Sequence, residues 1–270
     1  GPMPDRNERI WEFPGTPGNT RYLMGGGDAE VAETFGGDDW FEMGTGNDSA
    51  NGGSGNDLLE GGPGNDTLAG GDGDDTLIAN SYASLDADLD DFALPEAPGA
   101  RDTLSGGEGD DLLLGSAGVE TMVGGAGRDQ LFGGAGSDSL VGDADPGAPG
   151  VDPVAAATEG DADEIDAGPG DDAVNAGGGD DLVFGGPGDD RLGGGAGDDT
   201  LIGGEGEDFI FAGTGADTVF AGAGNDWILA ENDALGDYLD GGEGDDDIRA
   251  SGTGSVALGG GGRDYLYALT

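Results

Sequence analysis

Large apolar residues recur along this chain at intervals of nine, each two positions after an acidic residue. Residues 61–69 read GGPGNDTLA and residues 70–78 read GGDGDDTLI. Far downstream, residues 194–202 read GGAGDDTLI and residues 203–211 read GGEGEDFIF. The shared pattern is G-G-x-G-x-D-x-U-x, in which U is a large apolar residue, and its positions are numbered one to nine below. A fixed short period predicts a solenoid in which each repeat is one unit of a stack.

Each repeat is expected to divide into a six-residue turn and a three-residue strand. Glycine at positions one, two and four allows positive φ angles and close approach of neighbouring backbones. Because side chains alternate along a strand, position eight points inward while positions seven and nine point outward. One apolar residue in nine predicts a thin core. The inward positions include Leu59, Leu68, Leu77, Leu113, Leu131, Leu140, Val183, Leu201, Ile210, Val219 and Ile228.

The repeats form blocks, with about 22 repeats in all and Asp at position six in about 20 of them. Two extra residues, Ala230 and Glu231, interrupt the last block, and Glu30, Glu120 and Ser255 replace Asp at position six. We expect residues 1–33 to form an N-terminal cap with a degenerate repeat, 34–78 the first block, 79–96 an insertion, 97–141 the second block, 142–157 a loop insertion, and 158–270 the third block with a C-terminal cap.

The composition restricts the partners of the chain. It has 58 acidic and 8 basic residues, a formal net charge of −50, and its basic residues are all Arg. Nucleic acid binding needs a basic surface, and anionic membranes repel such a polyanion. No apolar run approaches the roughly 20 residues of a membrane helix. We therefore expect no nucleic acid and no membrane insertion, and we expect cations as partners.

Two classes of active site are excluded by residue types that are missing. The chain has no Cys and no His, so it lacks thiolate nucleophiles, disulfides and the commonest general base. Acidic clusters such as residues 245–247 are expected to combine one ligand position with solvated neighbours rather than to catalyse. The 64 Gly and 12 Pro residues would indicate disorder without a period. A flexible linker, however, has no need of an apolar residue two positions after nearly every Asp.

The repeats resemble those of the repeats-in-toxin (RTX) family, over most of the chain from about residue 34 to residue 267. The resemblance implies an all-β, right-handed parallel β-roll (a β-solenoid) with two repeats per coil of about 18 residues. It also implies multiple Ca²⁺ ions between stacked turns, each with about six oxygen ligands drawn from carbonyls and one Asp of each turn. No catalytic residue is expected, so the chain is not predicted to be an enzyme.

The expected metal ligands are of two kinds. The carboxylates at position six are Asp39, Asp48, Asp57, Asp66, Asp75, Asp102, Asp111, Asp129, Asp138, Asp163, Asp172, Asp181, Asp190, Asp199, Asp208, Asp217, Asp226, Asp237, Asp246 and Asp264. By resemblance, carbonyls of positions two and four also bind, at Gly53, Gly55, Gly62, Gly64, Gly71, Gly73, Gly107, Gly109, Gly168, Gly170, Gly177, Gly179, Gly186, Gly188, Gly195, Gly197, Gly204 and Gly206. The sequence does not decide whether the turns of Glu30, Glu120 and Ser255 bind metal.

Charge predicts a folding switch. Without metal, stacked carboxylates about 4.8 Å apart would repel one another. About 14 to 18 Ca²⁺ ions would add roughly +28 to +36 to the net charge. The metal-free chain, with its thin core, is expected to be disordered, so that metal binding supplies the free energy of folding.

The family resemblance implies a secreted protein, extracellular or on a bacterial cell surface, exported unfolded by type I secretion and folded by external calcium. The expected role is that of a structural or interaction module. Two alternatives stay open: the C-terminal folding module of a larger secreted enzyme, with an upstream domain, and a cell-surface or matrix adhesin that binds polysaccharide.

Segments outside the repeats carry weaker predictions. Ser84 to Phe92 has the spacing of a short amphipathic helix, which would cover the solenoid or dock a partner. Trp11, Phe13, Tyr22 and Leu23 are expected to cap the first coil or to contact an upstream domain. Residues 265–269 are predicted to form a C-terminal cap or a truncated junction. Trp40 and Trp227 point outward and would either cover an edge or stack on carbohydrate.

Overall fold

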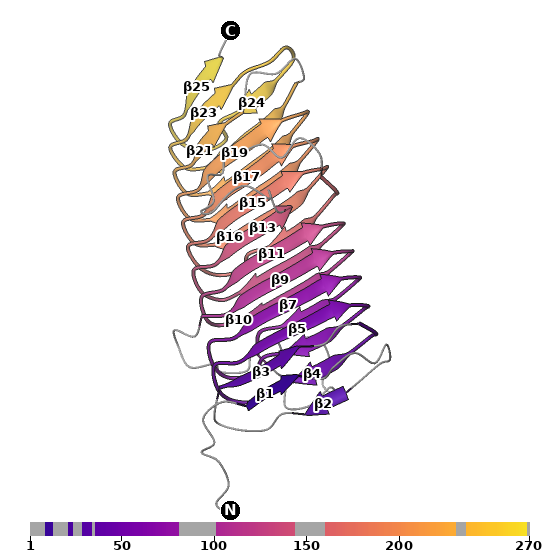
Figure 1. Cartoon of the computed structure of the whole chain (residues 1–270). Coiled ribbons are helices and arrows are strands. Elements are labelled where there is room, and N and C mark those ends of the chain that lie inside the picture. The colour runs from indigo at the N-terminus through magenta and orange to yellow at the C-terminus, as the bar shows by residue number, and fades with distance from the viewer. Residues whose placement is uncertain are drawn as a thin grey trace, which may run out of the picture.

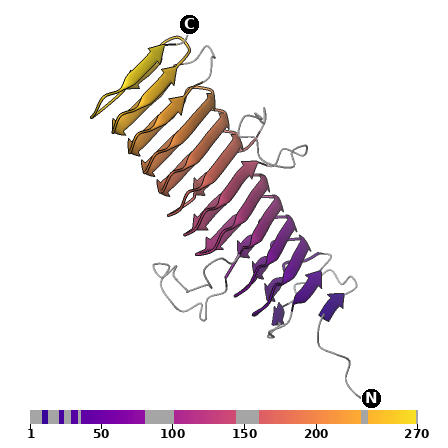
Figure 2. The same cartoon turned by 90° about the vertical axis from the view of Figure 1, so that its left-hand side faces the viewer.

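The protein is a parallel β-roll in which the chain passes alternately between two sheets. The structure, a computed structural model, describes residues 9–12, 21–23, 29–33, 36–80, 101–143, 160–230 and 236–268. The coils stack in one row from the N-terminal to the C-terminal end (Figures 1 and 2). About 11 coils are formed, and the predicted all-β parallel β-roll is confirmed.

One sheet has 13 strands and the other 12, each holding every second strand of the chain. Sheet A consists of β1 (Arg9–Glu12), β3 (Glu30–Glu33), β5 (Ser49–Ser54), β7 (Thr67–Asp72), β9 (Thr103–Glu108), β11 (Thr121–Ala126), β13 (Ser139–Asp143), β15 (Ala173–Gly178), β17 (Arg191–Ala196), β19 (Phe209–Thr214), β21 (Trp227–Leu229), β23 (Asp247–Ala250) and β25 (Tyr265–Ala268). Sheet B consists of β2 (Arg21–Leu23), β4 (Trp40–Glu42), β6 (Leu58–Glu60), β8 (Thr76–Ile78), β10 (Leu112–Ser116), β12 (Gln130–Gly134), β14 (Glu164–Asp166), β16 (Leu182–Pro187), β18 (Thr200–Glu205), β20 (Thr218–Ala223), β22 (Tyr238–Glu243) and β24 (Val256–Leu258).

The register places equivalent repeat positions directly above one another. Val183 of β16 pairs with Leu201 of β18, which is the residue one coil later. The pairing continues across both long insertions, since Leu68 pairs with Leu104 and Leu131 pairs with Ile165. The two sheets are therefore continuous where the sequence is interrupted.

Many strands are longer than the predicted three residues. In β7, for example, the strand runs from position seven through position three of the next repeat, and Gly71 pairs with Gly53 of the preceding coil. The prediction was wrong here because glycine at positions one and two keeps the backbone close enough for ladder pairing to continue into the turn. The true turn is correspondingly tighter.

Each sheet contributes two columns of core residues rather than one. Every inward residue named from the sequence is buried, as predicted. Position one is buried as well, where it is occupied by small residues such as Ala79, Ala167, Ala176 and Ala212, and by Met43. Alternation makes positions eight and one both face inward, so the expectation of one core residue in nine was too low.

The three interruptions lie inside turns, after their first one or two positions. Ala79 and Asn80 are buried before one insertion, and Gly142 and Asp143 occupy the same two positions before the next. Ala230, predicted to be an extra residue, is buried at position one and donates its N–H to Arg249 O at 3.0 Å. In each case the described chain is thus interrupted within a turn, and strand pairing continues on both sides.

The two ends differ in what they present. The segments with Trp11 and Tyr22 form strands that pair with β3 and β4, so they continue the sheets. At the other end, Tyr265, Leu266 and Tyr267 of β25 are each about half exposed. Of the loop predicted at 142–157, Gly142 and Asp143 end β13 instead. Residues 144–157, the segment predicted as a helix, Phe13 and Leu269 lie outside the described residues.

Candidate metal centre

The position-six carboxylates form two columns, one along each edge of the solenoid. The first column precedes the strands of sheet A and includes Asp190 and Asp208; the second precedes sheet B and includes Asp181 and Asp199. Asp39 through Asp246 of the predicted set are all buried, and Asp264, in the last coil, is half-buried. Successive turns therefore bring the predicted carboxylates together, two repeats apart in sequence.

A hydrogen-bond ladder aligns each column. The backbone N–H of Asp181 donates to Oδ1 of Asp199 at 2.9 Å, and the N–H of Asp190 donates to Oδ1 of Asp208 at 2.9 Å. The ladder passes across an insertion where Asp129 donates to Asp163 at 2.8 Å. One oxygen of each carboxylate is thus fixed by the preceding coil, and the other is held in a defined direction.

That second oxygen, Oδ2, is buried and accepts no hydrogen bond from the described part of the chain in most of these residues. Buried polar atoms are normally paired, so a repeated orphan oxygen indicates a ligand. The residues concerned are Asp48, Asp57, Asp75, Asp111, Asp129, Asp138, Asp163, Asp172, Asp181, Asp190, Asp199, Asp208, Asp226 and Asp246.

Backbone carbonyl oxygens surround the orphan carboxylate oxygens. A Cβ atom placed on Gly106, at position one, would overlap Asp111 Oδ2 and lie 2.6 Å from the carbonyl oxygen of Gly124 in the next coil. The same two kinds of oxygen flank Gly203, where they come from Asp208 and Ala221. Glycine at position one therefore leaves a space beside these oxygen atoms that a side chain would fill.

The predicted carbonyls of positions two and four also face the next coil. Gly177 O and Gly179 O lie where Cβ atoms of Gly195 and Gly197 would be, and both of those glycines have positive φ. Sixteen of the eighteen glycines named from the sequence present their carbonyls in this way. For the other two, Gly62 and Gly64, no such contact is described. Metal binding by these carbonyls stays a prediction.

The electrostatics of the columns oppose ionisation in the absence of metal. Burial raises the pKa of Asp57, Asp111 and Asp199 to about 7, although the N–H donated by the preceding Asp lowers it. Neighbouring carboxylates raise it further, as Asp181 does for Asp199. An ordinary aspartate is fully ionised at neutral pH. The raised pKa of these three carboxylates shows that their surroundings do not stabilise the negative charge.

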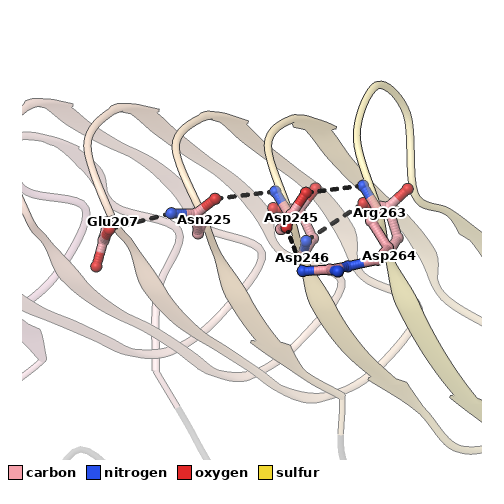
Figure 3. A network of polar contacts seen from close by, with 6 residues as sticks. All are labelled: Glu207, Asn225, Asp245, Asp246, Arg263 and Asp264. Atoms are coloured by element: carbon pink, nitrogen blue, oxygen red, sulfur yellow. Dashed lines mark hydrogen bonds and ion pairs between the residues drawn. The ribbon is translucent and has the colours of Figure 1, made fainter.

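An outer ladder runs beside the first column, and Figure 3 shows its C-terminal part. Asn225 donates to Glu207 at 3.1 Å, the N–H of Asp245 donates to Asn225 Oδ1 at 2.9 Å, and Arg263 contacts the Asp245 carboxylate at 2.9 Å. These position-five side chains are exposed and bond to one another. They align the turns from outside and do not enter the buried column.

Two degenerate turns have their oxygens otherwise engaged. Glu120 is longer than Asp, and its carboxylate accepts from the N–H and hydroxyl of Ser116 in its own turn, at 3.3 and 3.0 Å. Ser255 takes the ladder bond from the N–H of Asp237 at 3.2 Å but has no second oxygen. Glu30 is buried and donates its N–H to Asp48 at 2.8 Å. Glu120 and Ser255 thus keep the ladder while supplying no orphan oxygen.

The donor set fits calcium. Carboxylate and carbonyl oxygens are the ligands that this hard cation prefers, and the turns offer both around the same point. Within the described ranges, no three acidic side chains converge on one point. The oxygens that lie beside the carboxylates are main-chain carbonyls, as at Gly106 and Gly203.

Sequence reasoning missed one class of oxygen, the position-one carbonyl. It lies next to Asp Oδ2 of the preceding coil at Ala79, Gly203 and Ala221, among others. Position one is Gly or Ala in most repeats, with Met43 as an exception, and every residue type carries the same main-chain carbonyl. The signal available in the sequence was the preference for small residues at position one.

The outward aromatic residues near the C-terminal end stack on each other. The rings of Phe209 and Trp227 are 4.1 Å apart and nearly parallel. Arg191 lies over Phe209, and Arg249 lies over Trp227, each at 5.2 Å. The faces of this ladder are thus covered by neighbouring side chains, a geometry that matches cation–π and stacking interactions within the chain.

Comparison with known proteins agrees with the repeat geometry. A family model for the RTX calcium-binding nonapeptide repeat matches residues 42–77, 99–131, 114–146, 158–192, 193–228 and 236–253. No curated protein matches the chain significantly. Among the described residues, no helix is long and apolar enough to cross a membrane. The matched residues make up more than half of the chain and include most of the buried Asp columns, so the chain belongs to the family of RTX calcium-binding nonapeptide repeat proteins.

Proposed function

We propose that this chain is a secreted calcium-binding β-roll that folds when Ca²⁺ binds outside the cell and then acts as a structural or interaction module. The observation that carries the proposal is the two columns of buried Asp Oδ2 atoms, several of which lie beside a main-chain carbonyl of the next coil. Family membership supports calcium binding, and secretion is proposed from the low calcium of the cytosol.

The chain's own residues would do three things. The position-six carboxylates would bind the ion through Oδ2 while Oδ1 keeps the ladder bond to the preceding coil. The carbonyls of positions one, two and four would complete the oxygen shell. The apolar columns would pack once the turns are aligned. Bound calcium supplies the positive charge that makes close stacking of the carboxylates favourable.

Metal-dependent folding follows from the balance of these contributions. The core is narrow, and each additional coil places another buried carboxylate in each column. Without a cation, repulsion and desolvation oppose the stacking that the apolar residues favour. Calcium binding is therefore expected to contribute folding free energy directly.

Far-UV circular dichroism of the metal-free chain during a Ca²⁺ titration tests this proposal, with Mg²⁺ as the control. We expect a cooperative change from coil to β structure with calcium and little change with magnesium, which is smaller and demands stricter octahedral geometry. A β spectrum that a chelator leaves unchanged would contradict the proposal.

An alternative is that the chain is the folding module of a secreted enzyme. A catalytic sequence encoded next to it in the same gene would support this alternative. The polysaccharide-binding alternative has less support, because the faces of Phe209 and Trp227 are already covered by ring and guanidinium neighbours. A sugar ring would need one of those faces. The C-terminal apolar residues of β25 are a better candidate for contact with another domain.

A further inference from the structure

The turn that carries the second insertion differs from the regular turns at positions two and four, where Asp143 and Asp161 replace glycine. Its positions one and two are Gly142 and Asp143, and after the insertion its positions three to six are residues 160–163. Asp143 pairs in register with Gly125 of the preceding coil, so it stands at position two, where the repeat has glycine. Asp143 is only 8% exposed, so its carboxylate lies inside the turn.

The Asp143 side chain occupies the place that a carbonyl takes elsewhere. At Gly195 and Gly204, a Cβ would overlap the position-two carbonyl oxygen of the preceding coil. At Gly177, the corresponding neighbour is the Asp143 side chain, with Cβ at 2.8 Å and Oδ2 at 3.2 Å. No described residue other than glycine has a positive φ. Asp143 therefore does not adopt the glycine backbone, and its side chain, rather than a carbonyl oxygen, faces Gly177.

The same turn contains an orphan carboxylate oxygen. Asp163 is 3% exposed, its Oδ1 accepts from the N–H of Asp129 at 2.8 Å, and its Oδ2 has no partner in the described part of the chain. A Cβ on Gly142 would overlap that Oδ2 and the carbonyl oxygen of Ala176. The oxygen is thus directed into the gap between this turn and the next.

Asp143 lies close enough to act on this column electrostatically. Burial raises the pKa of Asp163 to about 8, and the charges of Asp129, Asp143 and Asp181 add to the shift. The charge of Asp143 likewise raises the pKa of Asp129 and Asp181. The Asp143 carboxylate therefore adds negative charge close to three successive carboxylates of the second column.

We propose that this turn forms a calcium site of its own composition, in which Asp143 is an additional carboxylate ligand beside Asp163. The proposal rests on the calcium-binding function proposed above and deepens it. Calcium sites bind more tightly as the number of charged ligands and the rigidity of the site increase. The Asp143 carboxylate is already held by the N–H of Gly178 at 3.1 Å, so this site binds more tightly than the regular turns and fixes the chain where the insertion leaves and re-enters.

A purely structural role for Asp143 is the competing explanation. Its carboxylate accepts from Gly178 in the next coil, and the backbone of Asp161, beyond the insertion, also bonds to it. A clasp of this kind needs only an acceptor oxygen, which Asn retains. As a calcium ligand, Asn is weaker than Asp because it lacks the negative charge that tightens a calcium site. Asp143→Asn therefore separates the two explanations.

The experiment compares Asp143→Asn with Asp166→Asn in the full chain. Asp166 is an exposed carboxylate of the same coil, so the control makes the same change in charge outside the turn. Urea unfolding is measured at several calcium concentrations. We expect Asp143→Asn to weaken one site about tenfold, a loss of about 1.4 kcal/mol at saturating calcium, and the loss to shrink as calcium is lowered. Asp166→Asn should cost little at any concentration.

A second measurement keeps the test decisive if Asn perturbs folding. Asp143→Gly restores the repeat residue and should show the same calcium-dependent loss. In a crystal structure of the calcium-loaded chain, an Asp143 oxygen should lie within about 2.3–2.6 Å of an ion. If that distance is absent and both Asn variants behave alike, the inference is wrong while the proposed function stands. If the wild-type chain binds no calcium, the proposed function itself fails.

Discussion

Replacing one column carboxylate by its amide should destabilise the calcium-loaded protein and do the opposite to the metal-free fold. Asp199 suits the test, because it is 1% exposed, its Oδ1 accepts from Asp181 at 2.9 Å and its Oδ2 has no partner in the described ranges. Asn at this position keeps the ladder acceptor and removes the charge. Asp198→Asn is the matched control, since Asp198 is exposed and accepts from the N–H of Ala216 at 2.8 Å.

The size of the effect of Asp199→Asn depends strongly on which quantity is measured. Loss of a charged ligand that weakens one site tenfold to a hundredfold corresponds to about 1.4 to 2.8 kcal/mol. If roughly 18 ions bind in one cooperative transition, that loss is shared among them, and the calcium midpoint moves by less than about a third. A calcium titration would therefore miss the effect.

Urea unfolding at fixed, saturating calcium reports the whole loss. We expect Asp199→Asn to lower the free energy of unfolding by about 1.4 to 2.8 kcal/mol, and Asp198→Asn to change it by less than about 0.5 kcal/mol. Without metal, two carboxylates about 4.8 Å apart repel by about 3 kcal/mol at an effective dielectric constant near 20, so the amide should favour the metal-free fold. Equal losses for the two variants in calcium would refute the assignment of Asp199 as a ligand.

Three further predictions follow from the same geometry. Burial raises the pKa of many column carboxylates to about 6 to 8, which is above the value in the unfolded chain. Their protonation therefore favours the metal-free fold at pH below about 4, and this contribution is lost as pH rises through 6 to 8. Circular dichroism without calcium should show β structure increasing on acidification, and no change would contradict the buried columns. Gly195→Ala should lower the melting temperature more than Gly254→Ala, because both glycines have positive φ but only at Gly195 would a Cβ overlap a carbonyl oxygen, that of Gly177; equal shifts would mean that the oxygen can move aside. Trp227→Ala should cost about 1 kcal/mol more than Phe220→Ala in calcium, because Trp227 is stacked on both ring faces while Phe220 is 41% exposed, and urea unfolding that shows no difference would argue against the stack.

Much of the fold and of the site could be predicted from the repeat itself. A period of nine with Asp at position six and an apolar residue at position eight is enough to place Asp199 in a turn and Leu201 in the core, since alternation along a strand leaves no other choice. The same pattern gives the ligand chemistry, because a carboxylate among glycines points to a hard cation. Those predictions depend only on local geometry and recur in every coil.

The rest depended on how one coil stacks on another. The sequence does not show that the position-one carbonyls of residues such as Ala221 lie beside Asp208 Oδ2, because carbonyls carry no residue signature. Nor does it show that Glu120 turns back onto Ser116, or that Asp143 fills the place of a carbonyl, because both depend on the depth of one turn and the register of the next. The sequence by itself determined the nine-residue repeat and the chemistry of its acidic turn, because both follow from the period. The tertiary structure decided which oxygens share one gap, because contacts between coils are set by stacking and not by neighbours along the chain.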